Sequence, residues 1–513
     1  MVSPSAALAR LAEPLYPHRR AAKSTILIVI LWAAAAFGQT FQPRVRASFG
    51  YRENRAHPIP ARWLGINLAA LNDSNSLTEL TQAGFSESRK IAGIPEVYET
   101  TTPNWNSIDR NMTMQQSNGL HPVILLAYSP PWLQPTQGPC AGVPTVPPTD
   151  IAQWAQIAAS YVAHLDQAFP GLVHDYEIWN EPELQKSFCV ADDRDATRLK
   201  LYLSIYAAAA SAMRTQAEID GVKIRIGGPT IAVLSRASEW ISTLLSNSRT
   251  APNVDFVSYH MYLTGDKEIR QGMDWSTLYS ITQSSSHGQL FNHLNVENLV
   301  RQGHQPDPSS TPIYVTEYND NWTFEHDCCR NDPSFAALWN SVFMANFLNS
   351  VYEGAKHVPD KLFYFAGNAG PYMCIAGTWN TNMDCDPGDL QPYPQFYAYQ
   401  LLASPDYLGL AGGGYMASWV RPGSTQTGLM ATAFYTHTKD VIVIVNPTYK
   451  THPAVRVVAN HSGIKTGVGT LFLLDQNHAK ITSTPLPLET FKGGYAATIS
   501  VPAYSTVAVT IEP

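Results

Sequence analysis

Short apolar runs alternate with longer helix-like segments along most of the chain after residue 60. Most of these runs are continuous rather than alternating, which is typical of parallel strands that are covered by helices. They predict eight β-strands, which are Trp63–Asn67, Ser88–Ile91, Val123–Tyr128, Val173–Ile178, Val222–Gly227, Val254–Tyr259, Ile313–Thr316 and Lys361–Ala366.

Helix-like segments lie between most of the predicted strands. Three of them are Asp150–Phe169, the alanine-rich Thr197–Ile219 and Ser334–Glu353. Eight repeats of a strand and a helix over about 300 residues predict a parallel (β/α)8 barrel, or TIM barrel. We assign this barrel to residues 60–403.

The pattern changes after about Ser404, where short strand-like runs follow one another without helices between them. Turn residues separate these runs, which predicts an antiparallel β-sandwich over residues 404–513. We also expect residues 40–60 to return and pair with this domain. The predicted strands are Leu429–Thr436, Val441–Asn446, Ala454–Val458, Thr470–Leu474, Ala496–Val501 and Thr506–Ile511.

The first 38 residues predict a targeting segment. Basic residues between His18 and Lys23 precede an apolar run from Thr25 to Phe37, which is shorter than the ~20 residues of a spanning helix. Small residues follow, as they do at the cleavage site of a secretory signal. The pattern predicts a secreted protein, extracellular or periplasmic. An uncleaved membrane anchor and an N-terminal core helix are the alternatives.

Composition narrows the class of protein. Hydrophobic residues make up 45% of the chain, which excludes global disorder. Charged residues make up only 15% and the net charge is −7, so a nucleic-acid-binding surface is not expected. Aromatic residues reach 11%, and a surface poor in charge and rich in aromatics suits a protein that handles neutral polymers.

Two predicted strand ends carry a glutamate. Glu181 follows the fourth strand and Glu317 follows the seventh, and they are 136 positions apart. Reactive groups of a TIM barrel lie at the carboxyl ends of its strands, so both side chains are expected to face one cleft. Glycoside hydrolysis needs two such carboxyl groups, one protonated and one ionised.

The segments around these glutamates resemble a known group of enzymes. The runs 177–182 (EIWNEP), 315–319 (VTEYN), 255–262 (DFVSYHMY) and 127–132 (AYSPPW) are similar to those of the retaining glycoside hydrolases of clan A. Within that clan the chain is most similar to glycoside hydrolase family 39, which holds β-xylosidases and α-L-iduronidases. The predicted barrel and sandwich match the layout of that family.

The resemblance implies roles for individual residues. Glu181 would be the general acid/base and Glu317 the nucleophile, while Asn180 would bind the 2-hydroxyl of the sugar. His260 and Tyr262 would face the cleft, and Tyr262 would donate a hydrogen bond to Glu317. Arg89, in the second strand, is expected either to act on Glu317 through its charge or to neutralise Glu177 inside the barrel. Glu177 itself is expected to be structural.

Tryptophans near strand ends are candidates for stacking on sugar rings, with plain packing as the alternative. Trp132 and Trp322 are our main candidates, because both closely follow strand tips. Clan A families often carry a platform tryptophan on the eighth strand. This chain has none there, and the nearest one is Trp379.

All six cysteines fall in loops that follow strands three, four, seven and eight, which share one face of the barrel. We predict the disulfides Cys140–Cys189 and Cys374–Cys385. Cys328 and Cys329 either pair with each other or exchange partners with the eighth loop. No Cys-x-x-Cys spacing typical of zinc is present, so we expect no metal site.

Together these observations predict a secreted retaining glycoside hydrolase that cleaves β-linked glycosides of the xyloside or glucoside type by double displacement. We expect a carbohydrate substrate, with no metal, organic cofactor or nucleic acid. One alternative is an endo-β-glucanase or mannanase of a related clan A family. Another is a non-catalytic carbohydrate-binding protein on the same fold, and a third is a sandwich that mainly anchors the protein to a cell surface.

Overall fold

The computed structural model describes residues 43–49, 57–67, 74–263, 275–285, 288–303, 310–319, 333–349, 358–365, 378–379, 385–386, 394–416, 418–421, 427–436 and 438–513. The predicted targeting segment 1–38 lies outside these residues. Among the residues described, no helix is both long and apolar enough to cross a membrane.

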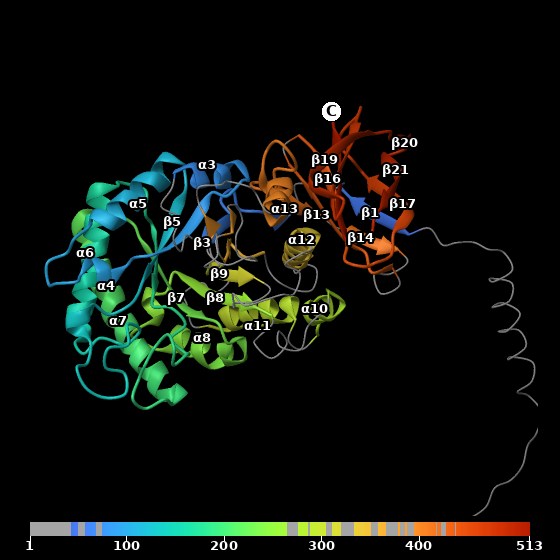
Figure 1. Cartoon of the computed structure of the whole chain (residues 1–513). Helices are drawn as coiled ribbons and strands as arrows, with labels where there is room; N and C mark the ends of the chain where they lie inside the picture. Colours follow the sequence, from blue (N-terminus) through green and yellow to red (C-terminus); the bar gives the residue numbers. More distant parts are fainter. Residues whose placement is uncertain are drawn as a thin grey trace, which may run out of the picture. The chain divides into compact units, whose positions relative to one another are not determined.

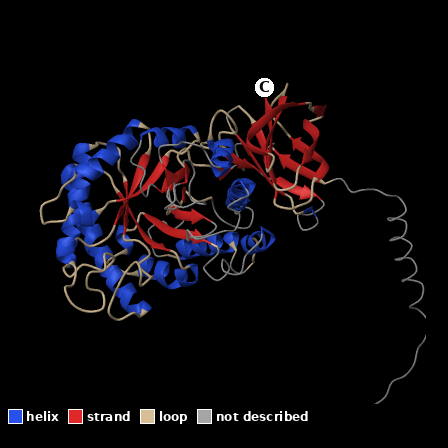
Figure 2. Ribbon diagram, in the orientation of Figure 1, coloured by secondary structure: helices blue, strands red, loops and turns tan. Residues whose placement is uncertain are grey.

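Eight parallel strands close into a barrel in the order β10-β3-β4-β5-β6-β7-β8-β9, which confirms the predicted TIM barrel (Figure 1, Figure 2). The strands are β3 (Leu64–Asn67), β4 (Glu87–Ile91), β5 (His121–Leu126), β6 (Asp175–Ile178), β7 (Arg225–Ile231), β8 (Phe256–Tyr262), β9 (Ile313–Asn319) and β10 (Lys361–Tyr364). Each overlaps one of the eight predicted runs. The largest difference is at β7, which begins and ends later than predicted, since residues 222–224 have no regular secondary structure.

Small residues on two barrel strands make room for phenylalanines from others. A Cβ on Gly65 would lie 2.3 Å from the ring of Phe363, and a Cβ on Gly227 would lie 2.2 Å from the ring of Phe256. Phe256 in turn stacks on Tyr314 with ring centroids 4.2 Å apart. The interior is therefore filled with side chains, and a substrate has access only at the strand ends.

Helices surround the barrel strands, as Figure 2 shows. The helix α6 begins after Asp150, whose carboxylate accepts a hydrogen bond from Gln153 N at 3.0 Å. The helix α7 ends at Gly221, which adopts φ 70°. The helices described in the barrel domain are α3 (Ser74–Gln82), α4 (Ile94–Val97), α5 (Asn106–Ser117), α6 (Ile151–Ala168), α7 (Asp195–Asp220), α8 (Ala237–Ser246), α10 (Trp275–Thr282), α11 (Gln289–Gln302), α12 (Pro333–Asn349) and α13 (Pro394–Ala403). Short 3-10 turns in the described part of the chain are η1 (Pro131–Leu133), η2 (Leu234–Arg236) and η3 (Ala251–Asn253).

Two further sheets form the sandwich, in the orders β14-β1-β17-β21-β20 and β19-β18-β22-β16-β15-β13-β2. A cluster of buried aliphatic residues from both sheets, including Val45, Ile444 and Val457, forms their common core. The strands are β1 (Arg44–Ser48), β2 (His57–Pro58), β13 (Gly414–Met416), β14 (Ser418–Arg421), β15 (Met430–Tyr435), β16 (Asp440–Asn446), β17 (His452–Asn460), β18 (Val468–Asp475), β19 (His478–Leu486), β20 (Glu489–Phe491), β21 (Gly494–Val501) and β22 (Ser505–Glu512). A separate small ladder pairs β11 (Thr378–Trp379) with β12 (Cys385–Asp386).

The strand β1 comes from the start of the chain but lies inside the sandwich. It pairs antiparallel with β14 and parallel with β17. Its burial pattern alternates, with Val45 and Ala47 turned into the core. The strand β19 has no counterpart among the predicted runs, because its sequence is mostly polar and it is stabilised by pairing with β18.

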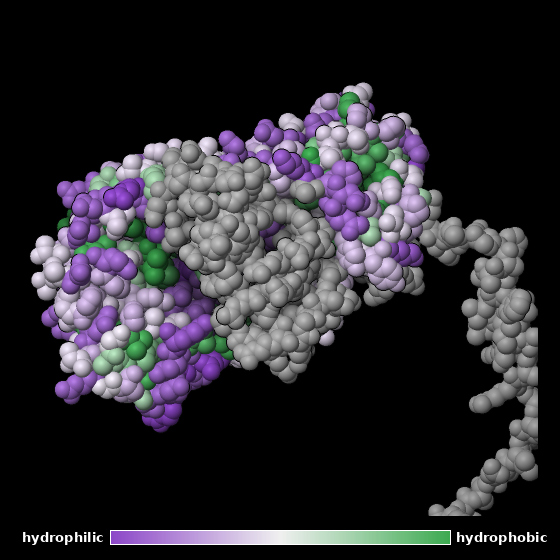
Figure 3. All heavy atoms as spheres, in the orientation of Figure 1, coloured by the Kyte–Doolittle hydropathy of each residue, from purple (hydrophilic) through white to green (hydrophobic). Residues whose placement is uncertain are grey.

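The described surface carries hydrophobic residues singly or in small patches on the face shown in Figure 3. The large exposed hydrophobic residues are spread over both domains, and they are Ile219, Phe291, Tyr449, Val468 and Phe491. Single exposed hydrophobic residues are normal for a folded domain and indicate no partner surface.

Candidate active site

Glu181 lies three residues beyond β6, in a loop that packs closely against the end of β7. The loop is anchored by Trp179, which is fully buried among Tyr128, Trp154 and Phe188. The indole N–H of Trp179 donates to Ser187 O at 2.9 Å. This aromatic anchor holds the loop in place, and the carboxyl of Glu181 stays partly exposed.

Glu317 lies inside β9, all of whose residues are buried. One of its carboxylate oxygens accepts a hydrogen bond from Tyr262 Oη at 2.7 Å, and the other accepts one from Arg89 Nη1 at 2.6 Å. Both oxygens are therefore held by donors from other strands, which fixes the direction in which the carboxylate points.

The two glutamates converge, with His260 between them. An oxygen of Glu181, an oxygen of Glu317 and a ring nitrogen of His260 all lie within 4.8 Å of one another. Nδ1 of His260 is 3.1 Å from Glu181 Oε1 and 3.4 Å from Glu317 Oε2. Residues 136 positions apart in the sequence thus form one cluster at the carboxyl ends of the barrel strands.

The sequence left open whether Arg89 acts on Glu317 or on Glu177. In the structure Arg89 contacts both carboxylates. Its Nε is 2.5 Å from Glu177 Oε2, while Nη1 bonds to Glu317. Its Nη2 donates to Asn180 Oδ1 at 2.9 Å. Burial alone would lower the pKa of Arg89, but Glu177 and Glu317 raise it above its ordinary value. One buried cation therefore contacts two buried carboxylates and orients the amide of Asn180.

The protonation of Glu181 and His260 is coupled. Burial raises the pKa of Glu181, but the hydrogen bond and charge of His260 oppose it and bring it below its ordinary value. Burial lowers the pKa of His260, whereas Glu317 and the bond to Glu181 raise it, and the balance lies above its ordinary value. The two groups therefore share one proton site, and both shifts favour the proton on His260 over Glu181.

Three residues near the cleft were missed by sequence reasoning. Ser187 Oγ donates to Glu181 Oε2 at 3.1 Å. Burial raises the pKa of Tyr128 to about 12, against the effect of its hydrogen bond with Asn180. Phe365, just after β10, meets the ring of Tyr262 edge-on at 6.1 Å. Tyr128 lies inside the segment 127–132, so the motif itself held the signal that would have found it.

Of the two tryptophans proposed for stacking, the structure describes Trp132. Trp132 lies in η1, is half-buried against the barrel core and donates from its indole to Tyr98 O at 3.0 Å. Its orientation is therefore set by the protein. Trp322 lies outside the described residues, so its role stays a prediction.

Cys140 and Cys189 form a disulfide with an S–S distance of 2.06 Å, which confirms that predicted pair. The bond joins the loops after β5 and β6 and packs against Val146. Cys328, Cys329 and Cys374 lie outside the described residues, so the pairing of Cys374 with Cys385 stays a prediction.

Removing this disulfide is expected to lower stability without abolishing folding. The bond closes a loop with a sequence separation of 49, and its loss in C140S/C189S should cost about 2–4 kcal/mol. Thermal unfolding of the double variant, compared with the oxidised wild type, measures this. An unchanged melting temperature would show that the described loops are held by packing alone.

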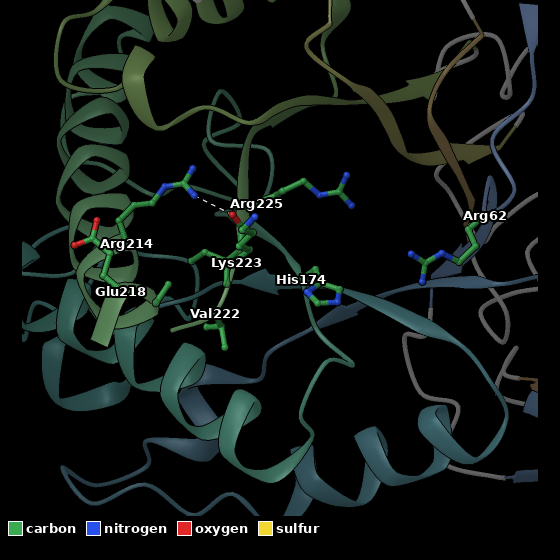
Figure 4. A pocket seen from close by; sticks show the side chains of 9 residues that line it. Arg62, His174, Arg214, Glu218, Val222, Lys223 and Arg225 are labelled. Carbon is green, nitrogen blue, oxygen red and sulfur yellow. Dashed lines mark hydrogen bonds between the residues drawn. The ribbon is translucent and has the colours of Figure 1, made fainter. Parts of the chain in front are cut away.

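A second hollow, of about 700 Å³, lies at the opposite end of the barrel, at the start of β6 and β7 (Figure 4). Its three arginines already have partners. Arg214 donates to Ile224 O at 2.8 Å, and Arg225 Nε is 2.6 Å from Asp175. Arg62 Nε is 3.6 Å from Glu87. We regard this hollow as part of the ion-pair network that closes the bottom of the barrel.

A closed TIM barrel with two glutamates that converge at its strand ends fits the geometry of a glycoside hydrolase. A model of glycosyl hydrolases family 39 matches residues 93–353, slightly more than half of the chain. The chain belongs to this family, as its motifs predicted.

Solved structures agree with this fold. The GH39 enzyme of Xanthomonas axonopodis pv. citri is 16% identical with a TM-score of 0.62, covering 92% of this chain and 98% of that one. A monomeric β-xylosidase of Caulobacter crescentus CB15 is 17% identical with a TM-score of 0.61, covering 91% and 99%. A bacterial orthologue of human α-L-iduronidase is 14% identical with a TM-score of 0.64, covering 92% and 84%.

Proposed function

We propose that this glycosidase retains the anomeric configuration and cleaves β-linked glycosides of the xyloside or glucoside type by double displacement. The observation that carries the proposal is the close approach of Glu181 and Glu317, whose nearest oxygens lie within 4.8 Å. Retaining enzymes hold their carboxyl groups about 5–5.5 Å apart, whereas inverting enzymes hold them ~6.5–9.5 Å apart to admit a water molecule.

In the first step Glu317 attacks the anomeric carbon while Glu181 donates a proton to the departing oxygen. The bond between sugar and aglycone breaks and a glycosyl-enzyme ester forms. In the second step Glu181, now ionised, takes a proton from water, which attacks the same carbon and releases Glu317. Tyr262 and Arg89 both donate hydrogen bonds to Glu317 and fix its direction, which supports its role as the nucleophile.

His260 supplies the proton that Glu181 donates in the first step. Nδ1 of His260 lies 3.1 Å from Glu181 Oε1, within reach of a direct transfer. Moving the shared proton to Glu181 leaves the total charge of the site unchanged, with a neutral acid, a neutral histidine and an ionised Glu317. A bound sugar displaces water from the cleft, which favours the neutral form of Glu181 over the carboxylate.

Asn180 is placed to bind the sugar 2-hydroxyl. Its Oδ1 is occupied by Arg89, so its amide nitrogen provides the remaining donors. A hydrogen bond at this hydroxyl strengthens as positive charge develops on the ring, and it therefore contributes more to the transition state than to substrate binding.

We also propose that the protein acts outside the cytoplasm, as a secreted or membrane-anchored enzyme. The disulfide Cys140–Cys189 supports an oxidising compartment. The basic and apolar pattern of residues 1–38 supports export. Mass spectrometry of the mature N-terminus distinguishes a cleaved signal from a retained anchor.

A panel of p-nitrophenyl glycosides that differ only in the sugar tests the substrate class. We expect the highest kcat/KM on a β-xyloside or β-glucoside, no turnover of the matching α-anomer, and a first product of β configuration by NMR. Dialysis against a chelator should leave these rates unchanged, because both proposed steps use protein side chains and water. A first product of α configuration, or no turnover of any β-glycoside, would overturn the proposal.

A further inference from the structure

Glu183 is a fully buried carboxyl that the proposed reaction does not use. It follows β6 by five residues. Its Oε1 accepts two backbone hydrogen bonds, from Ala232 N at 2.7 Å and from Val233 N at 2.9 Å, just after β7. Among the residues described, Oε2 has no hydrogen-bond partner. The side chain therefore ties the loop after β6 to the end of β7.

The segment that Glu183 ties down is strained. Trp179, Glu181 and Thr230 have φ values of 69°, 45° and 56°, in the left-handed region that disfavours side chains with a Cβ. Two hydrogen bonds link these residues across the two strand ends. Glu181 N donates to Thr230 O at 3.3 Å, and Thr230 Oγ1 donates to Trp179 O at 3.0 Å. Such conformations persist only where surrounding contacts hold them.

We propose that Glu183 is a positioning residue for the acid/base Glu181, holding the strained loop so that the Glu181 carboxyl stays within reach of both His260 and the leaving oxygen. The inference rests on the proposed function of Glu181. It is carried by the pair of backbone hydrogen bonds that a buried carboxylate oxygen accepts and by the strain two residues away. Without this tie the loop is free to relax toward ordinary φ values, and Glu181 moves with it.

Charge gives Glu183 a second effect on the same residue. Burial raises the pKa of Glu183 to about 7, with the backbone donors opposing the shift and Glu181 adding to it. When Glu183 ionises, its negative charge opposes loss of the proton that Glu181 and His260 share, since the interaction between two titrating groups is reciprocal. The other titratable or charged groups that face Glu183 or line the hollow beside it are Asp193, Arg194, Asp195, Arg198, Tyr202 and Arg236.

The first test uses the leaving group as a probe of acid catalysis. In E183A we expect a loss of kcat/KM, which reports the first chemical step, of about 10–100-fold on an alkyl or phenyl β-glycoside, whose departure needs a well-placed acid. On a 2,4-dinitrophenyl glycoside, which departs without a proton, the expected loss is less than about threefold. A loss equal on both substrates in a folded variant would overturn the inference.

The second test uses E183Q, which keeps an oxygen for the two backbone donors but removes the charge. It should restore the leaving-group dependence of the wild type. The basic limb of its kcat/KM profile against pH should lie at lower pH, because the shared proton of Glu181 and His260 is lost more easily. If E183A does not fold, the pH profile of E183Q tests the inference by itself. An unshifted basic limb would then overturn the inference.

Stability against pH gives a readout that is independent of activity. The pKa of Glu183 is higher in the folded protein than its unfolded value of 4.5, so its ionisation destabilises the fold as pH rises from about 4.5 to about 7. The melting temperature of E183Q should therefore rise relative to the wild type across this range. A constant difference would contradict a buried, titrating Glu183.

The control is E297Q, which neutralises another buried carboxyl, in α11, paired with Arg301 at 3.0 Å on the outside of the barrel. It should change neither the leaving-group dependence nor the basic limb. If the wild type hydrolyses no aryl β-glycoside, the proposed function fails. If the wild type is active and the Glu183 variants behave like E297Q, only the present inference fails.

Discussion

E317A is expected to lose activity on aryl β-glycosides by about 10⁵-fold or more, comparable to removal of a covalent nucleophile in other hydrolases. The alanine leaves a space on the face from which Glu317 would attack. Sodium azide should enter this space and restore turnover by direct displacement, and the product should be an α-glycosyl azide. Product analysis by NMR and kcat with and without azide provide the measurement.

Glu317 contacts both Arg89 and Tyr262, so its loss could also disturb the network around the site. E317Q keeps the shape of the side chain and serves as the matched variant. It should be as inactive as E317A but should not respond to azide, because no space is created. Full activity in either variant would end the assignment of Glu317 as the nucleophile.

E181A should show a different loss, which depends on the leaving group. For poor leaving groups we expect kcat/KM to decrease by about 10²–10⁴-fold, the usual contribution of a general acid. For a 2,4-dinitrophenyl glycoside the first step should remain fast and the glycosyl-enzyme should accumulate, giving a burst of released phenol. Stopped-flow absorbance measures this burst.

Azide distinguishes the two glutamates. In E181A it should attack the accumulated glycosyl-enzyme from the open face and give a β-glycosyl azide, the opposite anomer from that formed by E317A. The same anomer from both variants would contradict the assignment of separate roles. A loss in E181A that is independent of the leaving group would contradict the acid role of Glu181.

The two roles follow from different surroundings of chemically identical side chains. Glu317 is held by an arginine from β4 and a tyrosine from β8, while Glu181 is held by His260 and Ser187. Two carboxyl groups in one cleft need different surroundings, because one must keep a proton while the other must lose it. Arg89 contributes by pairing with Glu177 as well, so that this buried carboxylate near the nucleophile has a cation beside it.

Much of the barrel was readable because its strands are local patterns. A parallel strand covered by helices is apolar along its length, so Ile313–Asn319 and its counterparts could be recognised one by one. The predicted pairing of Cys140 with Cys189 needed only the knowledge that their loops share a face. Polar strands stabilised by a neighbour, such as β19, carry no such local signal.

The sequence alone determined the fold class, the family and the two strand ends that carry Glu181 and Glu317. Each of these can be recognised from a short segment or from the spacing between segments. Only the folded chain decided how these side chains share protons and charge. Arg89 contacts two carboxylates from two different strands, and His260 lies between Glu181 and Glu317. Glu183 reaches the backbone of Ala232, 49 positions away. Distances and burial between remote segments set pKa values and strain, and these depend on packing that no local pattern contains.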